Sequence, residues 1–466
     1  MASEQTHGRQ YTGMTEPQNN NSDFNRRDFL KGSSFATLMT MLGGVQLFAQ
    51  PAGEQKAETE PPKPPVKVGV IGLGPWGREI LDQLGRLKQA QVVALCDNYP
   101  AMMRRSSSKA PTAAQVGDYK AVLDNKEVQA VVIATPSHLH KEIVIAALSA
   151  GKHVYCEVPL ANTIEDAKAI ALAARNAVGK VFQPGLQMRS DPQRQFILPF
   201  IRSGALGKSV MARAQWHKKQ SWRADSPSEE RKKAINWRLD KSTSIGLVGE
   251  IGIHQLDQAT WMLNAPPMSV TGFSSLVLWN DGRDVPDTAQ LIMEYPEGVR
   301  LTYDATLANS FDSDYEMYYG SDAAVMMREN KAWMFKEVDS PLLGWEVYAR
   351  KDAFYKETGI ALVAGGSKQT ALGSKADEAP TLPSHYSALE NFLGNCGEVD
   401  AQVEDIKSSF GSVTKEALEK SLAEIKLRAA ATYKEGYEAT VLAIKANEAV
   451  VNGGRLEFKK EWFDLA

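Results

Sequence analysis

Residues 66–77, with the sequence VKVGVIGLGPWG, decide how the first folded part of the chain is interpreted. The run VKVGVI is apolar and rich in β-branched residues, which predicts a buried parallel strand, and residues 78–87 are typical of a helix. Between them lies the pattern Gly-x-Gly-x-x-Gly, which lets a pyrophosphate approach the backbone at the positive end of the helix dipole. The sequence therefore predicts a dinucleotide-binding Rossmann domain. Its predicted phosphate loop consists of Gly72, Gly74, Pro75, Trp76 and Gly77.

An acidic residue follows the next predicted strand. The apolar run 91–96 ends at Asp97, twenty residues after Gly77. A carboxylate at this point can accept hydrogen bonds from both ribose hydroxyls, and it would repel a 2′-phosphate. We therefore expect NAD as the cofactor, with NADP disfavoured. The alternative is a glycine-rich turn with an unrelated surface aspartate.

The alternation of strands and helices continues beyond Asp97. Further apolar strands are predicted at 128–134, 153–156 and 180–183, with helices between them. Because ligands bind beyond the carboxyl ends of the strands in such sheets, the residues that follow the strands should line one crevice. Those predicted to contact the cofactor there are Thr135, Pro136, His140 and Glu157. His138 fits equally well a functional residue or an exposed residue at a helix start.

The pattern changes after residue 187. Strands are predicted at 209–216, 276–279, 289–294 and 298–304, separated by turn signals and few helices, which suits a broad sheet. The predicted fold class is α/β, with an N-terminal Rossmann domain over 66–187. A C-terminal α+β domain over 188–466 carries a largely antiparallel open sheet, substrate and oligomer contacts, and a helical segment at 403–449.

A polar stripe on a predicted helix over 250–263 carries the candidate catalytic residues. Glu250 and His254 are one turn apart, so the carboxylate could orient the imidazole as a general base that takes a hydroxyl proton. The alternative is a surface histidine in a salt bridge. Glu250, His254 and Asp257 could also be metal ligands by residue type, but their spacing matches no recognised zinc motif, and we expect no metal.

Tryptophans and polar side chains gather in the second domain. Trp216, Trp222, Trp237 and Trp261 lie within 46 residues, beside several arginines. Aromatic rings next to polar groups suit a sugar, although two or more of these tryptophans could belong to the core. The residues predicted to bind substrate are Arg189, Trp222, Arg238, Asp257 and Tyr303, with His385 as a further candidate.

The N-terminal 65 residues are not expected to fold. Arg26 and Arg27 precede Phe-Leu-Lys and a weakly apolar stretch to residue 49, an order typical of a twin-arginine export signal. Residues 50–65 form a proline-rich linker, and no cysteine follows that could carry a lipid anchor. We therefore expect a periplasmic protein that meets the twin-arginine export machinery and has no stable membrane anchor.

Composition excludes several classes of protein. Lys plus Arg is 53 and Asp plus Glu is 56, so the net charge of −3 gives no sign of a nucleic-acid partner. Three scattered cysteines are too few for a disulfide framework. Outside the N-terminus, no apolar run is long enough to span a membrane.

Taken together, these motifs resemble the glucose–fructose oxidoreductase / inositol dehydrogenase (Gfo/Idh/MocA) family from about residue 66 to the end. The resemblance rests on the glycine loop, Asp97, Thr135-Pro136 with His140, and the stretches 151–159 (GKHVYCEVP), 204–208 (GALGK) and 249–257 (GEIGIHQLD). It implies an NAD-dependent oxidoreductase of a sugar, sugar derivative or polyol, with His254 as the acid/base. Members are often dimers or tetramers, so a homo-oligomer is expected. Some exported members hold their nicotinamide cofactor tightly.

The chain departs from the family pattern at two positions. Val158 stands where members commonly have a lysine that helps position the substrate, and Glu250 stands where they have an aspartate. These departures leave two alternatives open. One is a glycoside hydrolase that uses NAD for transient oxidation and elimination, and the other is a non-catalytic protein that binds a dinucleotide and a sugar.

Overall fold

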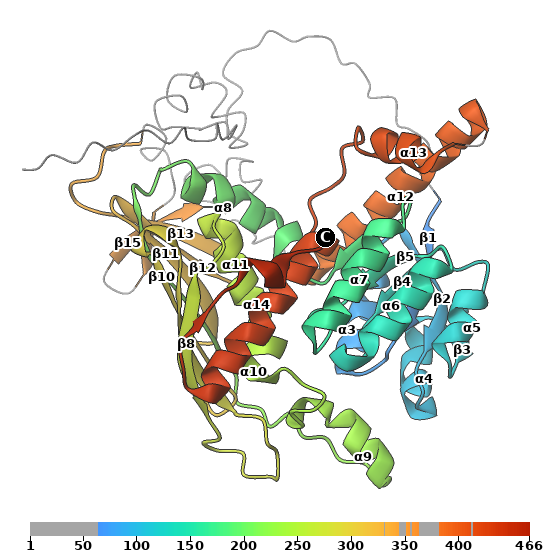
Figure 1. The fold of residues 1–466 in the computed structure, drawn as a ribbon, viewed down its shortest axis with the longest axis horizontal. Helices are drawn as coiled ribbons and strands as arrows, with labels where there is room; N and C mark the ends of the chain where they lie inside the picture. Colours follow the sequence, from blue (N-terminus) through green and yellow to red (C-terminus); the bar gives the residue numbers. More distant parts are fainter. Residues whose placement is uncertain (1–63, 330, 344–350, 355–356, 363–381, 412) are drawn as a thin grey trace, which may run out of the picture.

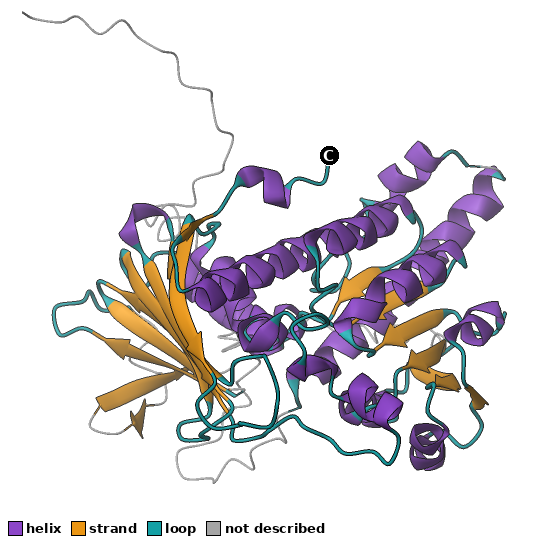
Figure 2. Cartoon of the chain, turned by 60° about the horizontal axis from the view of Figure 1, so that its bottom comes forward, coloured by secondary structure: helices purple, strands orange, loops and turns teal. Residues whose placement is uncertain are grey.

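The chain folds into two sheets that face each other across a layer of helices (Figure 1). The computed structural model describes residues 64–329, 331–343, 351–354, 357–362, 382–411 and 413–466. The predicted export signal and nearly all of the predicted linker lie outside these residues. Figure 2 shows the large sheet on one side and the smaller parallel sheet on the other, with helices between them.

The smaller sheet is the predicted Rossmann sheet. Its six strands lie in the order β3-β2-β1-β4-β5-β6, and every neighbouring pair is parallel. This order reverses between β1 and β4, which is where open α/β sheets bind their ligands. The strands are β1 (Val66–Ile71), β2 (Ala90–Cys96), β3 (Ala114–Val116), β4 (Ala130–Ile133), β5 (His153–Cys156) and β6 (Phe182–Pro184).

Helices connect these strands and cover both faces of the sheet. They are α3 (Pro75–Leu84), α4 (Pro100–Ser106), α5 (Tyr119–Asp124), α6 (His140–Ser149) and α7 (Ile164–Asn176), with the short turns η1 (Ser107–Lys109) and η2 (Ser137–Leu139). A further turn, η3 (Gln187–Ser190), follows β6 and leads into the second domain.

The larger sheet has ten strands and is antiparallel except where β10 pairs with β7. Its order is β14-β15-β13-β12-β11-β7-β10-β9-β8-β16. The strands are β7 (Ser209–His217), β8 (Ser269–Ser275), β9 (Thr288–Glu294), β10 (Arg300–Thr306), β11 (Asp314–Gly320), β12 (Ala323–Arg328), β13 (Lys331–Lys336), β14 (Lys351–Phe354), β15 (Glu357–Leu362) and β16 (Leu456–Glu457).

The strand predicted at 276–279 is wrong. The strand in this part of the chain is β8, and it ends before residue 276. The backbone N–H groups of Val277, Leu278 and Trp279 donate to the Asp287 carboxylate at 2.8–2.9 Å, so they are not available to a neighbouring strand.

The helical layer comes from the second domain and the C-terminal part of the chain. Its members are α8 (Pro192–Arg202), α10 (Gly246–Glu250), α11 (Ile253–Leu263) and α14 (Tyr433–Asn452). Helix α14 contributes Tyr437 and Val441 to an apolar cluster of the Rossmann side and Leu442 and Ala446 to the core of the large sheet. One helix therefore joins the two cores, and the two domains pack as a continuous body.

Helix α12 (Ser384–Phe410) belongs to the Rossmann domain, which corrects the predicted domain boundary. Its residues Leu389, Phe392 and Cys396 are buried in the same apolar cluster as Val68. The Gln183 side chain on β6 donates to its backbone at 2.9 Å. A Rossmann domain defined as 66–187 therefore lacks a helix that covers its sheet.

The remaining helices are peripheral. They are α9 (Glu229–Ile235), α13 (Lys415–Leu422) and the short turns η4 (Trp237–Leu239), η5 (Pro296–Gly298) and η7 (Lys460–Phe463). Among the helices of the described residues, none is both long and apolar enough to cross a bilayer.

Candidate active site at the domain interface

The glycine loop has the shape that a bound pyrophosphate requires. Gly72 has φ +93°, and a Cβ there would lie 2.7 Å from the Ala134 carbonyl oxygen. A Cβ on Gly77 would lie 1.9 Å from the Gly72 carbonyl oxygen, whereas a Cβ on Gly74 would meet open space. Helix α3 begins at Pro75, and no side chain caps its N-terminus. Its first N–H groups therefore remain available to an anion.

Asp97 connects this loop to the end of β2. One carboxylate oxygen accepts from the Leu73 N–H at 2.9 Å, and the other accepts from the Tyr99 N–H at 2.8 Å. Each oxygen keeps lone-pair capacity for a ribose hydroxyl. Arg231 on α9 reaches the same place, since its guanidinium lies 4.5 Å from the Tyr99 ring centre and donates to Asn98 at 3.2 Å. No periodic pattern in the sequence predicts this contact between the two domains.

Several buried polar atoms at the ends of β4, β5 and β6 have no hydrogen-bond partner within the described residues. They are Oγ1 of Thr135, Nδ1 of His138, Oε1 of Glu157 and Oε1 of Gln187. Burial raises the pKa of Glu157 to about 7. Because buried polar groups are normally paired, such a group of unpaired atoms at the ligand-binding edge of a Rossmann sheet indicates a ligand site. Pro136 lies between Thr135 and the short turn η2.

His140 is placed differently from its predicted contact with a cofactor. One ring nitrogen lies 3.0 Å from the Pro159 carbonyl oxygen, and the other lies 2.9 Å from the Thr135 carbonyl oxygen. Neither nitrogen is left for a ligand in this arrangement, and burial lowers the pKa of the ring to about 4. His140 thus joins the loops that follow β4 and β5, and its effect on a cofactor would pass through Thr135.

His385 and Trp76 lie together beside the glycine loop. Their ring centres are 5.0 Å apart, and Nε2 of His385 lies 3.4 Å from a carboxylate oxygen of Glu79 on α3. His385 comes from α12, so it belongs to the Rossmann side rather than to a sugar pocket of the second domain. Trp76 is 36% exposed, which leaves its ring accessible at the start of α3.

Two polar contacts hold the segment 250–257 against the Rossmann domain. At one end, Glu250 accepts a hydrogen bond of 3.0 Å from Ser137 in the loop after β4. At the other, Asp257 accepts from Arg189 of η3, which follows β6, at 2.8 and 2.9 Å. Ile253, next to His254, belongs to the same buried apolar cluster as Cys156 and Val158 at the end of β5.

The predicted partnership between Glu250 and His254 is corrected by the structure. The helix is interrupted at Ile251–Gly252, so the two side chains do not lie on one regular helical face. Besides Ser137, the Glu250 carboxylate accepts from Ser244 at 3.3 Å and from the Ile245 N–H at 3.2 Å. Nδ1 of His254 is buried without a partner among the described residues, and burial lowers the pKa of the ring to about 4.

The predicted substrate residues fall into three groups. Arg189 and Asp257 form the buried ion pair described above, and Arg189 also lies 5.4 Å from the Trp261 ring centre. Tyr303 is fully buried in the core of the large sheet, where its ring packs near Gly252, and its hydroxyl has no partner among the described residues. Trp222 and Arg238 lie together, with the guanidinium 5.9 Å from the ring centre.

Ser137, Gln187 and Ser244 were missed by sequence reasoning. Ser137 could have been found because it follows the same strand as Thr135, but nothing in its spacing distinguishes it from His138. Gln187 and Ser244 lie outside any periodic pattern, and only the packing of the domains brings them to the site. Within the described part of the chain, no three His, Cys, Asp or Glu side chains converge as metal ligands.

The fold and this site define a two-domain protein with a dinucleotide-binding half and a half that closes over its crevice. Residues 66–185 match the model of the oxidoreductase family with an NAD-binding Rossmann fold, and residues 198–325 match the GFO/IDH/MocA C-terminal domain. The two matches together cover more than half of the chain. The chain therefore belongs to the Gfo/Idh/MocA family.

Relatives in sequence include dehydrogenases of sugars and polyols. The chain is 36% identical over 149 residues to levoglucosan dehydrogenase of Pseudarthrobacter phenanthrenivorans, covering 31% of this chain and 36% of that protein. It is 26% identical over 242 residues to inositol 2-dehydrogenase of Salmonella typhimurium, covering 51% of this chain and 66% of that protein. The chain thus spans about a third of the first relative and less than two thirds of the second.

Solved structures agree with the fold over most of the chain. An oxidoreductase domain protein from Kribbella flavida has a TM-score of 0.64 at 19% identity, covering 85% of this chain and all of that one. Levoglucosan dehydrogenase in complex with NADH and levoglucosan has a TM-score of 0.62 at 19% identity, covering 84% of this chain and 99% of that one.

Proposed function

We propose that this protein is an exported, NAD-dependent dehydrogenase of a sugar, sugar derivative or polyol. The observation that carries the proposal is the position of His254, on a segment that is tied at Glu250 to Ser137 after β4 and at Asp257 to Arg189 after β6, and whose Ile253 packs in one cluster with Cys156 and Val158. An imidazole on a segment attached beyond β4 and β6 suits the edge of the sheet where a Rossmann domain presents its nicotinamide, which supports a role for His254 in the reaction. The names of the relatives, levoglucosan dehydrogenase and inositol 2-dehydrogenase, support the same class of substrate.

The residues present fit a dinucleotide. The space beside Gly74 and the uncapped start of α3 would take the pyrophosphate, and Asp97 would accept from the adenosine ribose. The unpaired Oγ1 of Thr135 and the Glu157 carboxylate would face the nicotinamide half. Asp97 favours NAD because a carboxylate repels a 2′-phosphate. The contact of Arg231 with Asn98 and Tyr99 spans the adenosine end, which supports tight retention of the cofactor.

His254 would act as the general base. Because burial holds its pKa near 4, the ring is neutral at physiological pH and can accept a proton from a substrate hydroxyl. The bound nicotinamide ring supplies the complementary chemistry, acceptance of a hydride from the same carbon. Glu250 would act at a distance, by fixing the segment that carries His254 to Ser137. The buried pair of Arg189 and Asp257 fixes the other end of that segment.

We also propose export and self-association. The Arg26-Arg27 pair and the apolar stretch after it support passage through the twin-arginine pathway to the periplasm, a route that exports folded proteins with their cofactors. The family resemblance supports a homo-oligomer. The comparisons do not favour the NAD-assisted hydrolase or the non-catalytic binding protein.

The proposal is tested on purified mature protein. Mass spectrometry of the denatured protein should release NAD or NADH, and adding NAD with a panel of sugars and polyols should produce NADH with at least one of them. His254→Ala should abolish NADH formation while the protein still binds NAD. A protein that binds no dinucleotide, or that cleaves aryl glycosides without net NADH, would contradict the dehydrogenase assignment.

A further inference from the structure

Arg238 has a partly buried guanidinium that donates no hydrogen bond to any described residue. Its charge lies over two aromatic rings, 4.4 Å from the Trp237 ring centre and 5.9 Å from that of Trp222. Burial lowers the pKa of Arg238, and the only opposing influence is the charge of Glu250. Glu250 does not bond to it, since its oxygens accept from Ser137, Ser244 and the Ile245 N–H. No described residue accepts from this guanidinium, so its N–H groups are available to a ligand.

The two aromatic rings offer the guanidinium no oxygen acceptor. A guanidinium that lies over an aromatic ring uses its face, whereas its five N–H donors point outward in its plane. Two parallel N–H groups match the two oxygens of a carboxylate. A single cation suits a singly charged carboxylate, whose charge it balances, better than a doubly charged phosphate.

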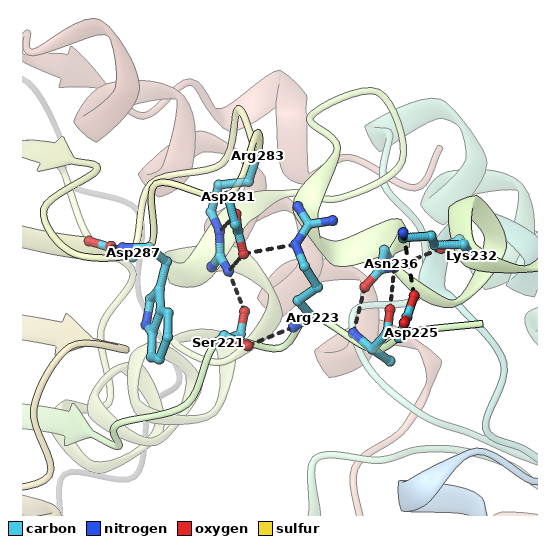
Figure 3. A network of polar contacts seen from close by, with 10 residues as sticks. Ser221, Arg223, Asp225, Lys232, Asn236, Asp281, Arg283 and Asp287 are labelled. Atoms are coloured by element: carbon cyan, nitrogen blue, oxygen red, sulfur yellow. Dashed lines mark hydrogen bonds and ion pairs between the residues drawn. The ribbon is translucent and has the colours of Figure 1, made fainter. Parts of the chain in front are cut away.

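Ser221 and Arg223, the residues on either side of Trp222, belong to a network of polar contacts (Figure 3). Trp222 has φ +60°, a conformation that costs a bulky residue about 1–3 kcal/mol and that surrounding structure must maintain. Its two neighbours are both anchored: the Ser221 carbonyl accepts from Arg283, and Arg223 donates to Asp281 at 2.8 Å. Arg283 donates to the same Asp281 at 2.6 and 2.8 Å.

A second set of hydrogen bonds joins the loop that carries Trp222 to the turn that carries Trp237. Asn236, which precedes Trp237, exchanges two hydrogen bonds of 2.8 Å with the backbone of Ala224 (Figure 3). Asn236 therefore holds the turn with Trp237 to the loop with Trp222, and Asp281 and Arg283 anchor that loop on the side of Ser221 and Arg223. Such bracing is expected of a preorganised binding group, in which side-chain freedom is lost before the ligand arrives.

The stack stands at the edge of the candidate active site. The Trp237 ring centre lies 5.9 Å from that of His138, in the loop after β4. The neighbouring residue Ser137 bonds to Glu250, which begins the segment that carries His254. We propose that Arg238, stacked on Trp237 and Trp222, binds the carboxylate of an acidic sugar, such as a uronic acid, through two N–H groups. This inference rests on the proposed function, in that it specifies the sugar class that the site accepts.

The test uses matched acidic and neutral sugars. D-glucuronate, its neutral methyl ester and D-glucose, and likewise D-galacturonate and D-galactose, are titrated into NAD-loaded protein by calorimetry and assayed for NADH formation. The wild type should bind one uronate about 10- to 100-fold more tightly than its neutral counterparts, the range expected for hydrogen bonds to a charged group. Arg238→Gln should lose that preference. Arg238→Lys should keep part of it, since it retains the charge without the fork.

Controls separate a substrate contact from other roles of Arg238. Arg300→Gln removes an exposed arginine on β10 that pairs with Glu294, and it should leave every affinity unchanged. NAD affinity should also be unchanged in both Arg238 variants. Equal losses for acidic and neutral sugars, a selective loss of NAD affinity, or equal binding of glucuronate and its methyl ester to the wild type would overturn the inference. Uronate binding without NADH formation would support the subsite and instead refute the proposed dehydrogenase activity.

Discussion

Alanine at Gly74 and at Gly77 should have opposite consequences for folding and binding. A Cβ on Gly74 meets open space, and its φ of −60° and ψ of −174° suit any residue. A Cβ on Gly77 lies 1.9 Å from the Gly72 carbonyl oxygen, which belongs to the backbone and cannot turn away. Gly74→Ala should therefore fold normally, whereas Gly77→Ala should force the loop away from α3.

The expected magnitudes follow from these contacts. Gly74→Ala should leave the free energy of unfolding unchanged or raise it by about 0.4–1 kcal/mol, because alanine restricts the unfolded chain. Its affinity for NAD should fall at least about tenfold, or about 1.4 kcal/mol, because the methyl group occupies the space that the pyrophosphate must approach. Gly77→Ala should cost about 1–3 kcal/mol or more of stability, as overpacked sites do.

Two measurements check this pair of variants. Denaturant unfolding of the cofactor-free protein gives the stability of each variant, and titration with NAD gives the affinity. Wild-type NAD affinity in Gly74→Ala would refute the placement of the pyrophosphate beside this residue. Wild-type stability in Gly77→Ala would show that the loop and α3 are not packed as the structure describes.

Four further perturbations test other parts of the assignment. His254→Ala should lower turnover by roughly 10²–10⁴-fold with NAD affinity intact, measured by steady-state kinetics and titration; retained turnover would exclude it as the base. Asp97→Ala should reduce the preference for NAD over NADP in paired titrations, and an unchanged ratio would mean that it does not face the ribose. Replacing Arg26 and Arg27 together by lysine should keep the folded precursor in the cytoplasm, and cell fractionation that still finds it exported would exclude the twin-arginine route. For Glu157, the folded-state pKa of about 7 lies above the unfolded value, so the free energy of unfolding should fall as pH rises from about 4.5 to 7. This fall should be on the order of 3 kcal/mol, and Glu157→Gln should remove it. Unfolding curves at both pH values measure the difference.

The local patterns of the sequence were sufficient for the Rossmann half. The strand, the glycine loop and Asp97 are neighbours in sequence or follow adjacent strands, so their spacing predicts their positions. Helix α12 could not be assigned to a domain from such patterns. An apolar stripe predicts that a helix is buried, but it does not predict which sheet the helix packs against. Only its packing on Val68 and its bond from Gln183 show that residues 384–410 complete the first domain.

The sequence predicts many residues of the candidate site, but it predicts the contacts between these residues less well. The helical wheel over 250–263 assumed an unbroken helix, whereas Gly252 marks a break: a Cβ there would lie 2.3 Å from the Val248 carbonyl oxygen and 3.0 Å from the Tyr303 ring. This close approach turns Glu250 toward Ser137 and buries Tyr303 beneath the helix. Contacts of this kind join residues more than one hundred positions apart, which no spacing in the sequence encodes.

The two departures from the family pattern bear on the same group, the imidazole of His254. Glu250 is bonded elsewhere, and Val158 lies in the apolar cluster that includes Ile253, so burial alone sets the pKa of His254 near 4. A base with so low a pKa is ready to accept a proton at any pH above about 5, but it holds that proton weakly. His254 therefore contributes no change in rate between pH 5 and 8. A change in rate near pH 7 would then have to arise from another group, and Glu157 at the end of β5, with its pKa of about 7, is the group that we expect to cause it.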